Sequence, residues 1–204
     1  MNKKHLYTAL YKLAGTDELR PMLRAIYHNN GIIVATNAHV LAEVQFSDYN
    51  PDHEDKAINK LGLPEEGRYP DYKSVIPDES TMTELRDDYI YNNLLKSCRN
   101  VIATEACTNG RVLINVNGIL LDKYYIVKVY RVITLLNERL TIYTSPIPNR
   151  PVLFKTEHLT AIIMPNSPNN VADNSSMDDR DPHYYTIKEA LAFQNPNAKW
   201  YSHP

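Results

Sequence analysis

The 204-residue sequence is poor in several residue types, and each scarcity argues against a class of protein. Its two cysteines, Cys98 and Cys107, fit neither a disulfide framework nor a metal-binding pair, so we expect a reducing compartment, the cytoplasm. No apolar run approaches the ~20 residues of a membrane-spanning helix. Residues 1–6 are basic, but no long apolar segment follows them, and we expect no secretory signal and no membrane partner.

Motifs of several enzyme classes are also missing. Neither G-x-x-x-x-G-K-[ST] nor G-x-G-x-x-G occurs, so nothing supports nucleotide binding. Seven histidines are scattered without an H-E-x-x-H pattern, and no metal site is expected. The loop acids are typical of a solvated surface, although a hydrolase using two of them stays an alternative: Asp71, Asp78, Glu79, Asp87 and Asp88. We therefore expect a protein that is not an enzyme and needs no cofactor.

What is present is an ordinary globular composition with an uneven distribution of charge. Hydrophobic residues make up 43% and charged residues 23%, enough for a buried core in one domain or two small ones. Three segments that we predict to be helices, 1–14, 89–102 and 119–136, contain one acid, Asp122. Their basic side chains are Lys3, Lys4, Lys12, Lys96, Arg99, Lys123, Lys128 and Arg131. Basic helices on an acidic body suit DNA binding, although helices chosen in this way could be basic without any function.

The first part of the chain predicts a helix followed by three antiparallel strands. Leu6, Leu10 and Leu13 recur at helical spacing within residues 3–14, and Gly15 ends the helix. Strands are expected over residues 19–28, 32–35 and 40–46, the first two joined by a hairpin turn at 29–31.

The second half repeats this order of elements. A short strand is predicted at 111–115 and a long helix over 119–136, in which Ile126, Val129 and Ile133 share one face. That period favours a helix despite the many β-prone residues. Strands are expected over residues 139–144, 151–155 and 159–164. The predicted fold class is α+β, with two helix-plus-antiparallel-strand units and the helices on one face of the sheets.

The remaining segments are less regular. Residues 47–88 are acidic, contain four prolines and predict an irregular excursion that ends in an extended strap at 69–77. An additional helix is predicted near 89–102. Residues 1–165 would then form the domain, and residues 166–204 a mobile polar tail in which 186–193 could form a short helix.

Three short segments, far apart in the sequence, carry the functional information. They read A-T-N-A-H-V-L-A at 35–42, Y-P-D-Y-K-S-V-I-P at 69–77, and R-P-V-L-F at 150–154 continuing to L-T-A-I-I-M-P at 159–165. In this order they resemble the A-T-D-G-H-R-L-A, F-P-D-Y-x-x-V-I-P and P-V-L-I … V-M-P-M segments of the bacterial DNA sliding clamp, the beta subunit of replicative DNA polymerase. The resemblance covers roughly residues 5–46 and 67–165.

In that family the three segments meet in a hydrophobic cleft, which receives short peptides from polymerases and from other replication and repair proteins. The resemblance therefore implies a peptide-binding cleft formed by Thr36, Ala38, His39, Leu41, Pro70, Val75, Ile162 and Met164. Adaptable apolar side chains suit varied partners, although each residue could instead be ordinary core. The resemblance also implies non-specific phosphate contacts with duplex DNA, for which the predicted helices offer Lys12, Lys96, Arg99, Lys123, Lys128 and Arg131.

The resemblance is incomplete in ways that affect the implied function. The family's Asp-Gly is Asn37-Ala38 here, its Arg is Val40, and its final Met is Asn166. A clamp subunit has three domains and two subunits close a ring, whereas this chain resembles one domain. A ring would need a homo-oligomer of about six copies. The alternative is a monomeric or dimeric peptide-binding adaptor or decoy without a ring. In a third hypothesis, the tail segment E-A-L-A-F at 189–193, which resembles the Leu-x-Phe end of clamp-binding peptides, occupies its own cleft or that of a neighbouring copy.

Overall fold

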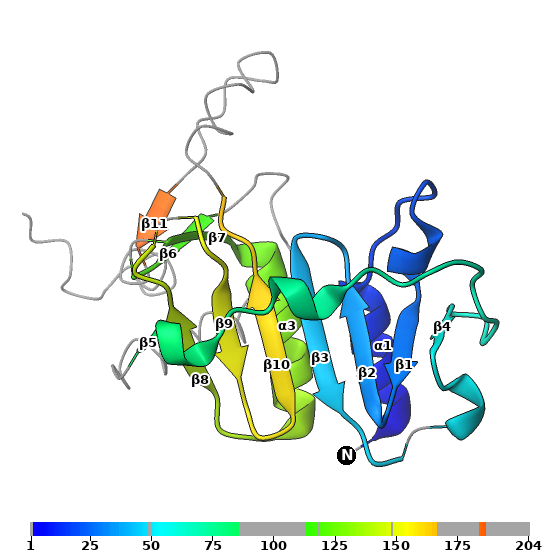
Figure 1. Ribbon diagram of the computed structural model, residues 1–204. Coiled ribbons are helices and arrows are strands. Elements are labelled where there is room, and N and C mark those ends of the chain that lie inside the picture. The colour runs from blue at the N-terminus through cyan, green and yellow to red at the C-terminus, as the bar shows by residue number, and fades with distance from the viewer. Residues whose placement is uncertain are drawn as a thin grey trace, which may run out of the picture. The chain divides into compact units, whose positions relative to one another are not determined.

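The computed structural model describes residues 2–48, 50–85, 113–117, 119–147, 149–166 and 184–186 (Figure 1). The chain divides into two compact units, and each is considered by itself. The first comprises Met1–Leu85 and Lys128–Met164, and the second comprises Arg86–Val127 and Pro165–Pro204. Among the described residues, no helix is both long and apolar enough to cross a membrane.

The first unit is built on one eight-stranded sheet. Its strand order is β4-β1-β2-β3-β10-β9-β8-β5, and all neighbouring strands in it are antiparallel. The strands are β1 (Ile26–Asn29), β2 (Ile32–Thr36), β3 (Val40–Gln45), β4 (Lys56–Ile58), β5 (Thr83–Glu84), β8 (Thr141–Thr144), β9 (Val152–Lys155) and β10 (Leu159–Ile163). Because β3 pairs with β10, the two predicted helix-and-strand units share a single continuous sheet.

Helix α1 (Lys3–Leu13) and the hairpin after it confirm the first predicted unit. The Asn2 side chain caps the helix by accepting a hydrogen bond from His5 N at 3.4 Å. The predicted leucine face is buried. Asn30 and Gly31 have φ of 48° and 74°, the left-handed conformation that a two-residue turn between β1 and β2 requires.

The strand predicted over residues 19–28 is wrong in its first part. Pro21–Arg24 form a 3-10 helix, η1, and β1 begins only at Ile26. Proline has no N–H for a strand ladder, and its fixed φ suits the first position of a helical turn. The later strands of both units are confirmed with small shifts at their ends.

Helix α3 (Lys123–Leu136) starts later than predicted. Residues Ile119–Asp122 form strand β7, which pairs with β6 (Leu113–Val116) in the second unit. The Asp122 carboxylate accepts a hydrogen bond from Tyr124 N at 2.9 Å, which supports the helix start. The predicted face of Ile126, Val129 and Ile133 is buried, as expected.

The excursion at 47–88 holds more regular structure than predicted. It contains three 3-10 helices, η2 (Pro51–His53), η3 (Tyr72–Val75) and η4 (Glu79–Thr81), and it supplies both edge strands of the sheet, β4 and β5. Strands of three and two residues are too short to show a period in the sequence. Residues 69–82, called the strap below, cross one face of the sheet (Figure 1).

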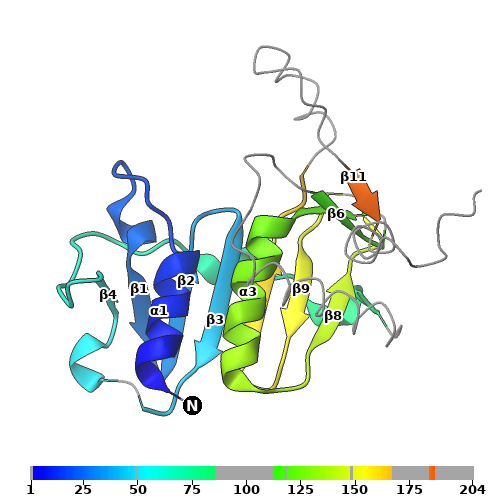
Figure 2. The same cartoon turned by 180° about the vertical axis from the view of Figure 1, so that it is seen from behind.

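The helices cover the opposite face of the sheet. Helix α1 and the part of α3 from Lys128 onward lie side by side behind the strands in Figure 1 and in front of them in Figure 2. The first unit therefore has three layers: helices, sheet and strap. This arrangement confirms the α+β class with the helices on one face.

Two predicted helices cannot be compared fully with the structure. The helix near 89–102 lies outside the described residues. For the segment 186–193, Thr186 belongs to β11 (Tyr184–Thr186), which pairs in parallel with β6 in the second unit, so a helix starting at this residue is wrong. Residues 187–193 lie outside the described part of the chain.

Candidate functional site

The candidate site lies at the seam where β3 meets β10, on the strap side of the sheet. Leu41 is the register partner of both Thr36 on β2 and Ile162 on β10. Directly opposite residues of antiparallel strands share one face, with Cβ atoms about 5 Å apart. Thr36, Leu41 and Ile162 are only 7%, 3% and 2% exposed, respectively. The structure thus brings three predicted cleft residues into one buried row.

The turn between β2 and β3 forms the end of this row. The Asn37 Oδ1 atom accepts hydrogen bonds from His39 N and Val40 N, both at 3.0 Å. The Thr36 hydroxyl donates to the Val40 carbonyl at 2.9 Å and accepts from Ala38 N at 3.2 Å. Ala38 has a φ of 74°, where the resembled family pattern has glycine, which adopts this conformation without steric cost.

Met164 joins this turn to the end of β10. Its N–H donates to the His39 carbonyl at 2.8 Å, while its side chain is 38% exposed. Ala38 and His39 are exposed as well. Three further predicted residues, one of them from the other half of the sheet, therefore form an accessible rim beside the buried row.

The strap supplies the last two predicted residues, Pro70 and Val75, and both are exposed. They lie between side chains that anchor the strap to the sheet. The ring of Tyr69 stacks on Tyr27 with centroids 4.6 Å apart, and the Tyr72 ring lies edge-on to both. At this site the structure thus has a buried floor and an exposed rim, and the strap crosses the same face of the sheet.

One charged residue of the strap forms an ion pair with the sheet. The Glu79 carboxylate forms an ion pair with Lys155 on β9. Hydrogen bonds from Lys155 and Tyr143 hold the pKa of Glu79 below its usual range, and the bond to Glu79 raises the pKa of Tyr143 to about 12. Burial, together with the Glu43 carboxylate, raises the pKa of Tyr72 to about 12. At neutral pH, the polar side chains that join the strap to the sheet are therefore neutral tyrosines and one charged pair.

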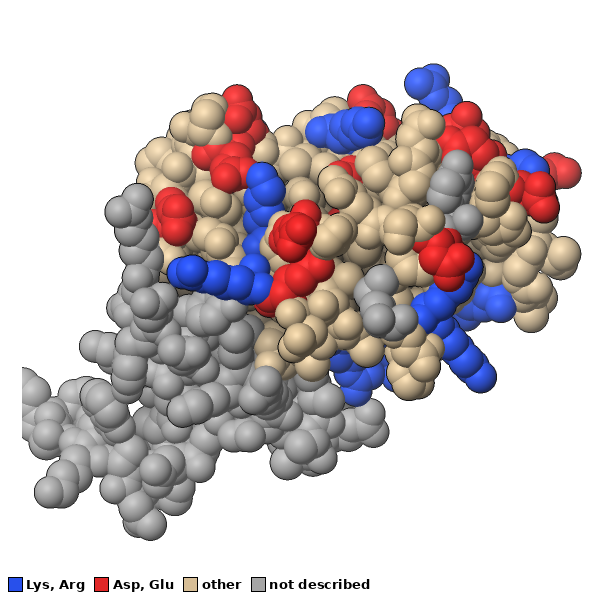
Figure 3. All heavy atoms as spheres, turned by 90° about the horizontal axis from the view of Figure 1, so that it is seen from below, with Lys and Arg blue, Asp and Glu red and all other residues tan. Residues whose placement is uncertain are grey.

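The residues predicted to contact DNA are only partly described. Lys12 is exposed on α1, and Lys128 and Arg131 are half-buried on α3 in the first unit. Lys123 begins α3 within the second unit, and Lys96 and Arg99 lie outside the described residues. Neither α1 nor α3 contains an acidic residue. By contrast, the face seen in Figure 3 carries basic and acidic side chains close together.

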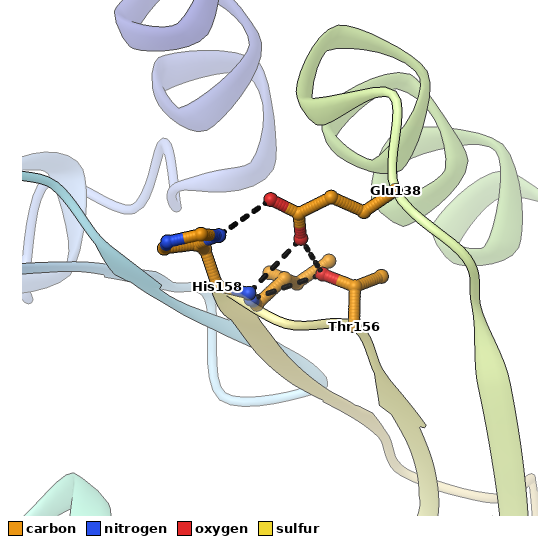
Figure 4. Close-up of polar contacts among 4 residues, drawn as sticks. Glu138, Thr156 and His158 are labelled. Atoms are coloured by element: carbon orange, nitrogen blue, oxygen red, sulfur yellow. Dashed lines mark hydrogen bonds and ion pairs between the residues drawn. The ribbon is translucent and has the colours of Figure 1, made fainter.

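A polar cluster at the other end of the seam was not predicted. Glu138, just after α3, accepts hydrogen bonds from Thr156 Oγ1 at 2.5 Å and His158 N at 2.9 Å, and its second oxygen lies 2.6 Å from His158 Nδ1 (Figure 4). Burial alone would raise the pKa of Glu138, but these bonds more than offset it and hold the pKa below its usual range. No local pattern links residues 18 and 20 positions apart.

A cavity of about 540 Å³ lies beside this cluster. Its lining includes Asn30, Gln45, Phe46, Leu136, Glu138 and His158. Side-chain atoms of Glu138, Glu157 and His158 that could coordinate a metal ion lie within 4.8 Å of one another. Both Glu138 oxygens, however, already have hydrogen-bonding partners. The hydrogen bonds of Glu138 join the β9–β10 turn to the end of α3.

Several solved structures share this fold. The sliding clamp of Bartonella birtlesii (DNA polymerase III subunit beta), bound to griselimycin, matches with a TM-score of 0.55 and 16% identity over 80% of this chain and 63% of that chain. The beta subunit of Borrelia burgdorferi, in complex with a natural product, matches with 0.55 and 14% over 80% and 62%. The clamp of Bacillus subtilis matches with 0.54 and 15% over 80% and 62%.

These comparisons define the class of the protein by its fold. No family model and no characterised protein sequence matches the chain. It spans less than two thirds of the length of the clamps that it matches. The chain has the fold of the bacterial DNA sliding clamp, and the resemblance noted in the three motif segments is confirmed at that level.

Proposed function

We propose that this chain is a non-catalytic protein of clamp fold that tethers partner proteins by binding their short peptides at the β3–β10 seam. One observation carries the proposal, which is the convergence of the three motif segments. Leu41 and Ile162 are register partners, the His39 carbonyl accepts a hydrogen bond from Met164 N, and the strap crosses the same face of the sheet.

The physical character of the rim and of the strap supports this role. Met164 and Val75 are 38% and 48% exposed, although both are apolar. Exposed apolar side chains beside an apolar core are a suitable surface for hydrophobic anchors of a linear peptide. Methionine is flexible and polarizable, so it can adapt to partners of different shape.

A binding measurement with one charge substitution tests the proposal. The probe is a fluorescein-labelled peptide with a Leu-x-Phe end, titrated with the full chain and followed by anisotropy. Met164→Asp places a carboxylate on the rim and should weaken binding by about tenfold or more. The matched control is Ile147→Asp, because Ile147 is also an exposed apolar residue but lies in the β8–β9 turn. Equal losses from the two substitutions, or no saturable binding at all, would contradict the proposal.

Association with duplex DNA is a second candidate function, and the charge of the helices favours it. Helices α1 and α3 carry lysine and arginine without any acid. On the helix face of the first unit, Lys12, Lys128 and Arg131 would make non-specific contacts with phosphate.

The outer edge of β4 favours an adaptor that forms no ring. Glu65 N donates to the Ala57 carbonyl, and Asn59 N donates to the Leu63 carbonyl, both at 2.8 Å. Pro64, which has no N–H, lies opposite Ile58. The chain's own turn thus occupies the edge that another copy would need for continuing the sheet. We therefore place the monomeric or dimeric adaptor ahead of a closed ring.

A further inference from the structure

The proposed peptide site, on which this inference rests, has a floor that is closed to solvent. Leu41, Leu153 and Ile162 belong to one buried cluster together with Tyr69 and Tyr72 of the strap. Ile76 and Met82, also from the strap, pack against the same cluster. A peptide can reach the rim at Met164 directly, but it can reach the floor only if part of the strap moves.

The strap's backbone is not bonded to the sheet. Within the described residues, the main-chain hydrogen bonds of residues 69–82 are short internal turns, such as Ile76 N to the Lys73 carbonyl at 3.2 Å and Met82 N to the Glu79 carbonyl at 3.0 Å. The flanking segments are different: Glu65 N donates to the Ala57 carbonyl and Leu85 N to the Ile142 carbonyl, each at 2.8 Å. The strap is thus fixed at both ends, and only side chains fasten it in between.

The two halves of the strap are fastened unequally. The first half is anchored by Tyr69 and Tyr72, both buried, which pack against Tyr27. The second half depends on the partly buried Ile76 and Met82 and on Glu79, which meets Lys155 and the Tyr143 hydroxyl. The side chains of Lys155 and Glu79 are 42% and 38% exposed. A pair this exposed contributes little stability, so the second half is the part that can open.

We propose that residues 76–82 of the strap are a hinged cover of the peptide site, latched by the Glu79 carboxylate on Lys155 and Tyr143. Partner peptides bind fully when this half lifts, while Tyr69 and Tyr72 hold the other half in place. The apparent affinity for peptide is then the affinity of the open form multiplied by the open fraction. Loosening the latch should raise that fraction and tighten binding.

The test is a latch substitution measured by two independent methods. Lys155→Met removes the charge but keeps an apolar chain of similar length. Glu79→Gln removes the charge from the strap side and serves as the second variant if the first fails to fold. Hydrogen exchange of the amides at 76–82 should become several-fold faster, and the labelled Leu-x-Phe peptide should bind about two- to fivefold tighter.

The matched control is Lys3→Met. Lys3 forms an ion pair with Asp48, with side chains 47% and 76% exposed, but it lies on α1 on the other side of the sheet. This substitution should leave both strap exchange and peptide affinity unchanged.

The outcomes separate this inference from the proposed function. If the peptide binds the unsubstituted chain and both latch variants with equal affinity, the cover is overturned while the peptide site stands. If strap exchange does not change in either latch variant, the latch is overturned. If no form binds the peptide, the proposed function fails, and faster exchange confined to 76–82 in the latch variants still supports an opening strap.

Discussion

Ile162 lies directly opposite Leu41 in the β3–β10 pair, and this relationship joins the two halves of the chain. It makes two short helix-and-strand units into one eight-stranded sheet. It also brings the first and third motif segments together. The second segment, which is part of the strap, crosses the same face of the sheet. The candidate peptide site is therefore a consequence of how the sheet is assembled.

The left-handed backbone at Ala38 predicts that Ala38→Gly stabilises the fold. A φ of 74° brings the alanine Cβ close to its own backbone, whereas glycine has no such contact. We expect a gain of about 1 kcal/mol in the free energy of unfolding, measured by urea denaturation. The control, Ala42→Gly, lies in the buried part of β3 and should destabilise. A loss of stability from Ala38→Gly would show that this turn is not strained.

A buried histidine predicts that the fold loses stability in acid. His28 is 0% exposed, stacks on Tyr7 at 5.9 Å and lies edge-on to His53 at 5.1 Å. Within the described part of the chain, neither of its ring nitrogens has a hydrogen-bonding partner. Burial, with smaller contributions from His53 and Lys3, lowers the pKa of His28 from 6.5 to about 4. The unfolded chain therefore binds the proton more readily than the folded chain.

The sign of the His28 effect follows from this difference. The contribution of His28 to the free energy of unfolding is fully present above pH 6.5. It is lost as the pH falls towards 4, and the loss reaches about 3 kcal/mol. Urea denaturation between pH 4 and 8 measures it. His28→Leu should flatten the difference between the two ends of this range, whereas His5→Gln, at an exposed position, should not. Identical pH profiles for His28→Leu and the unsubstituted chain would exclude His28 as the cause.

The basic helix face predicts salt-sensitive binding of duplex DNA. Binding driven by release of counterions weakens steeply as salt rises. Reversing two charges on α3, Lys128→Glu with Arg131→Glu, should lower the affinity for a fluorescent duplex by about tenfold or more and reduce the salt slope by about 2. Reversing Lys60 and Lys73, which lie outside α1 and α3, is the charge-matched control. A flat salt dependence, or equal effects of the two double variants, would remove the DNA role and leave the adaptor.

The closed edge of β4 predicts a small assembly. Residues 63–65 already hydrogen-bond or lie opposite residues 57–59, so the sheet cannot extend there without displacing them. Size-exclusion chromatography with light scattering should give the 23.4 kDa monomer, or a dimer, over a wide range of concentration. A stable assembly of about six copies would instead restore ring formation as the leading account.

Local patterns in the sequence predicted individual helices and turns better than they predicted which strands pair with one another. The leucine face of α1, the Asn30-Gly31 turn and the buried face of α3 follow from spacing alone. Pro21 is a local signal against the strand predicted over residues 19–28. Residues Ile119–Asp122 continue the apolar run of α3, and their strand depends on pairing with β6.

The candidate site shows the same division. The motif segments indicated which residues would converge, because they resemble a family whose cleft is known. The burial of Leu41 and Ile162 under the strap could not be inferred, since it depends on the packing of Tyr69, Tyr72, Ile76 and Met82. The Glu138 cluster was missed because its partners come from a distant turn.

Nuclear magnetic resonance of methyl groups would show directly whether a peptide binds at the β3–β10 seam. The full chain would be labelled at methionine and isoleucine methyl groups and titrated with the unlabelled Leu-x-Phe peptide. Met164→Leu would identify the Met164 signal. We expect saturable shifts of the Met164 and Ile162 signals, with the signal of the exposed Ile147 unchanged. Saturable binding that leaves the Met164 and Ile162 signals unshifted would place the peptide elsewhere and contradict binding at the seam.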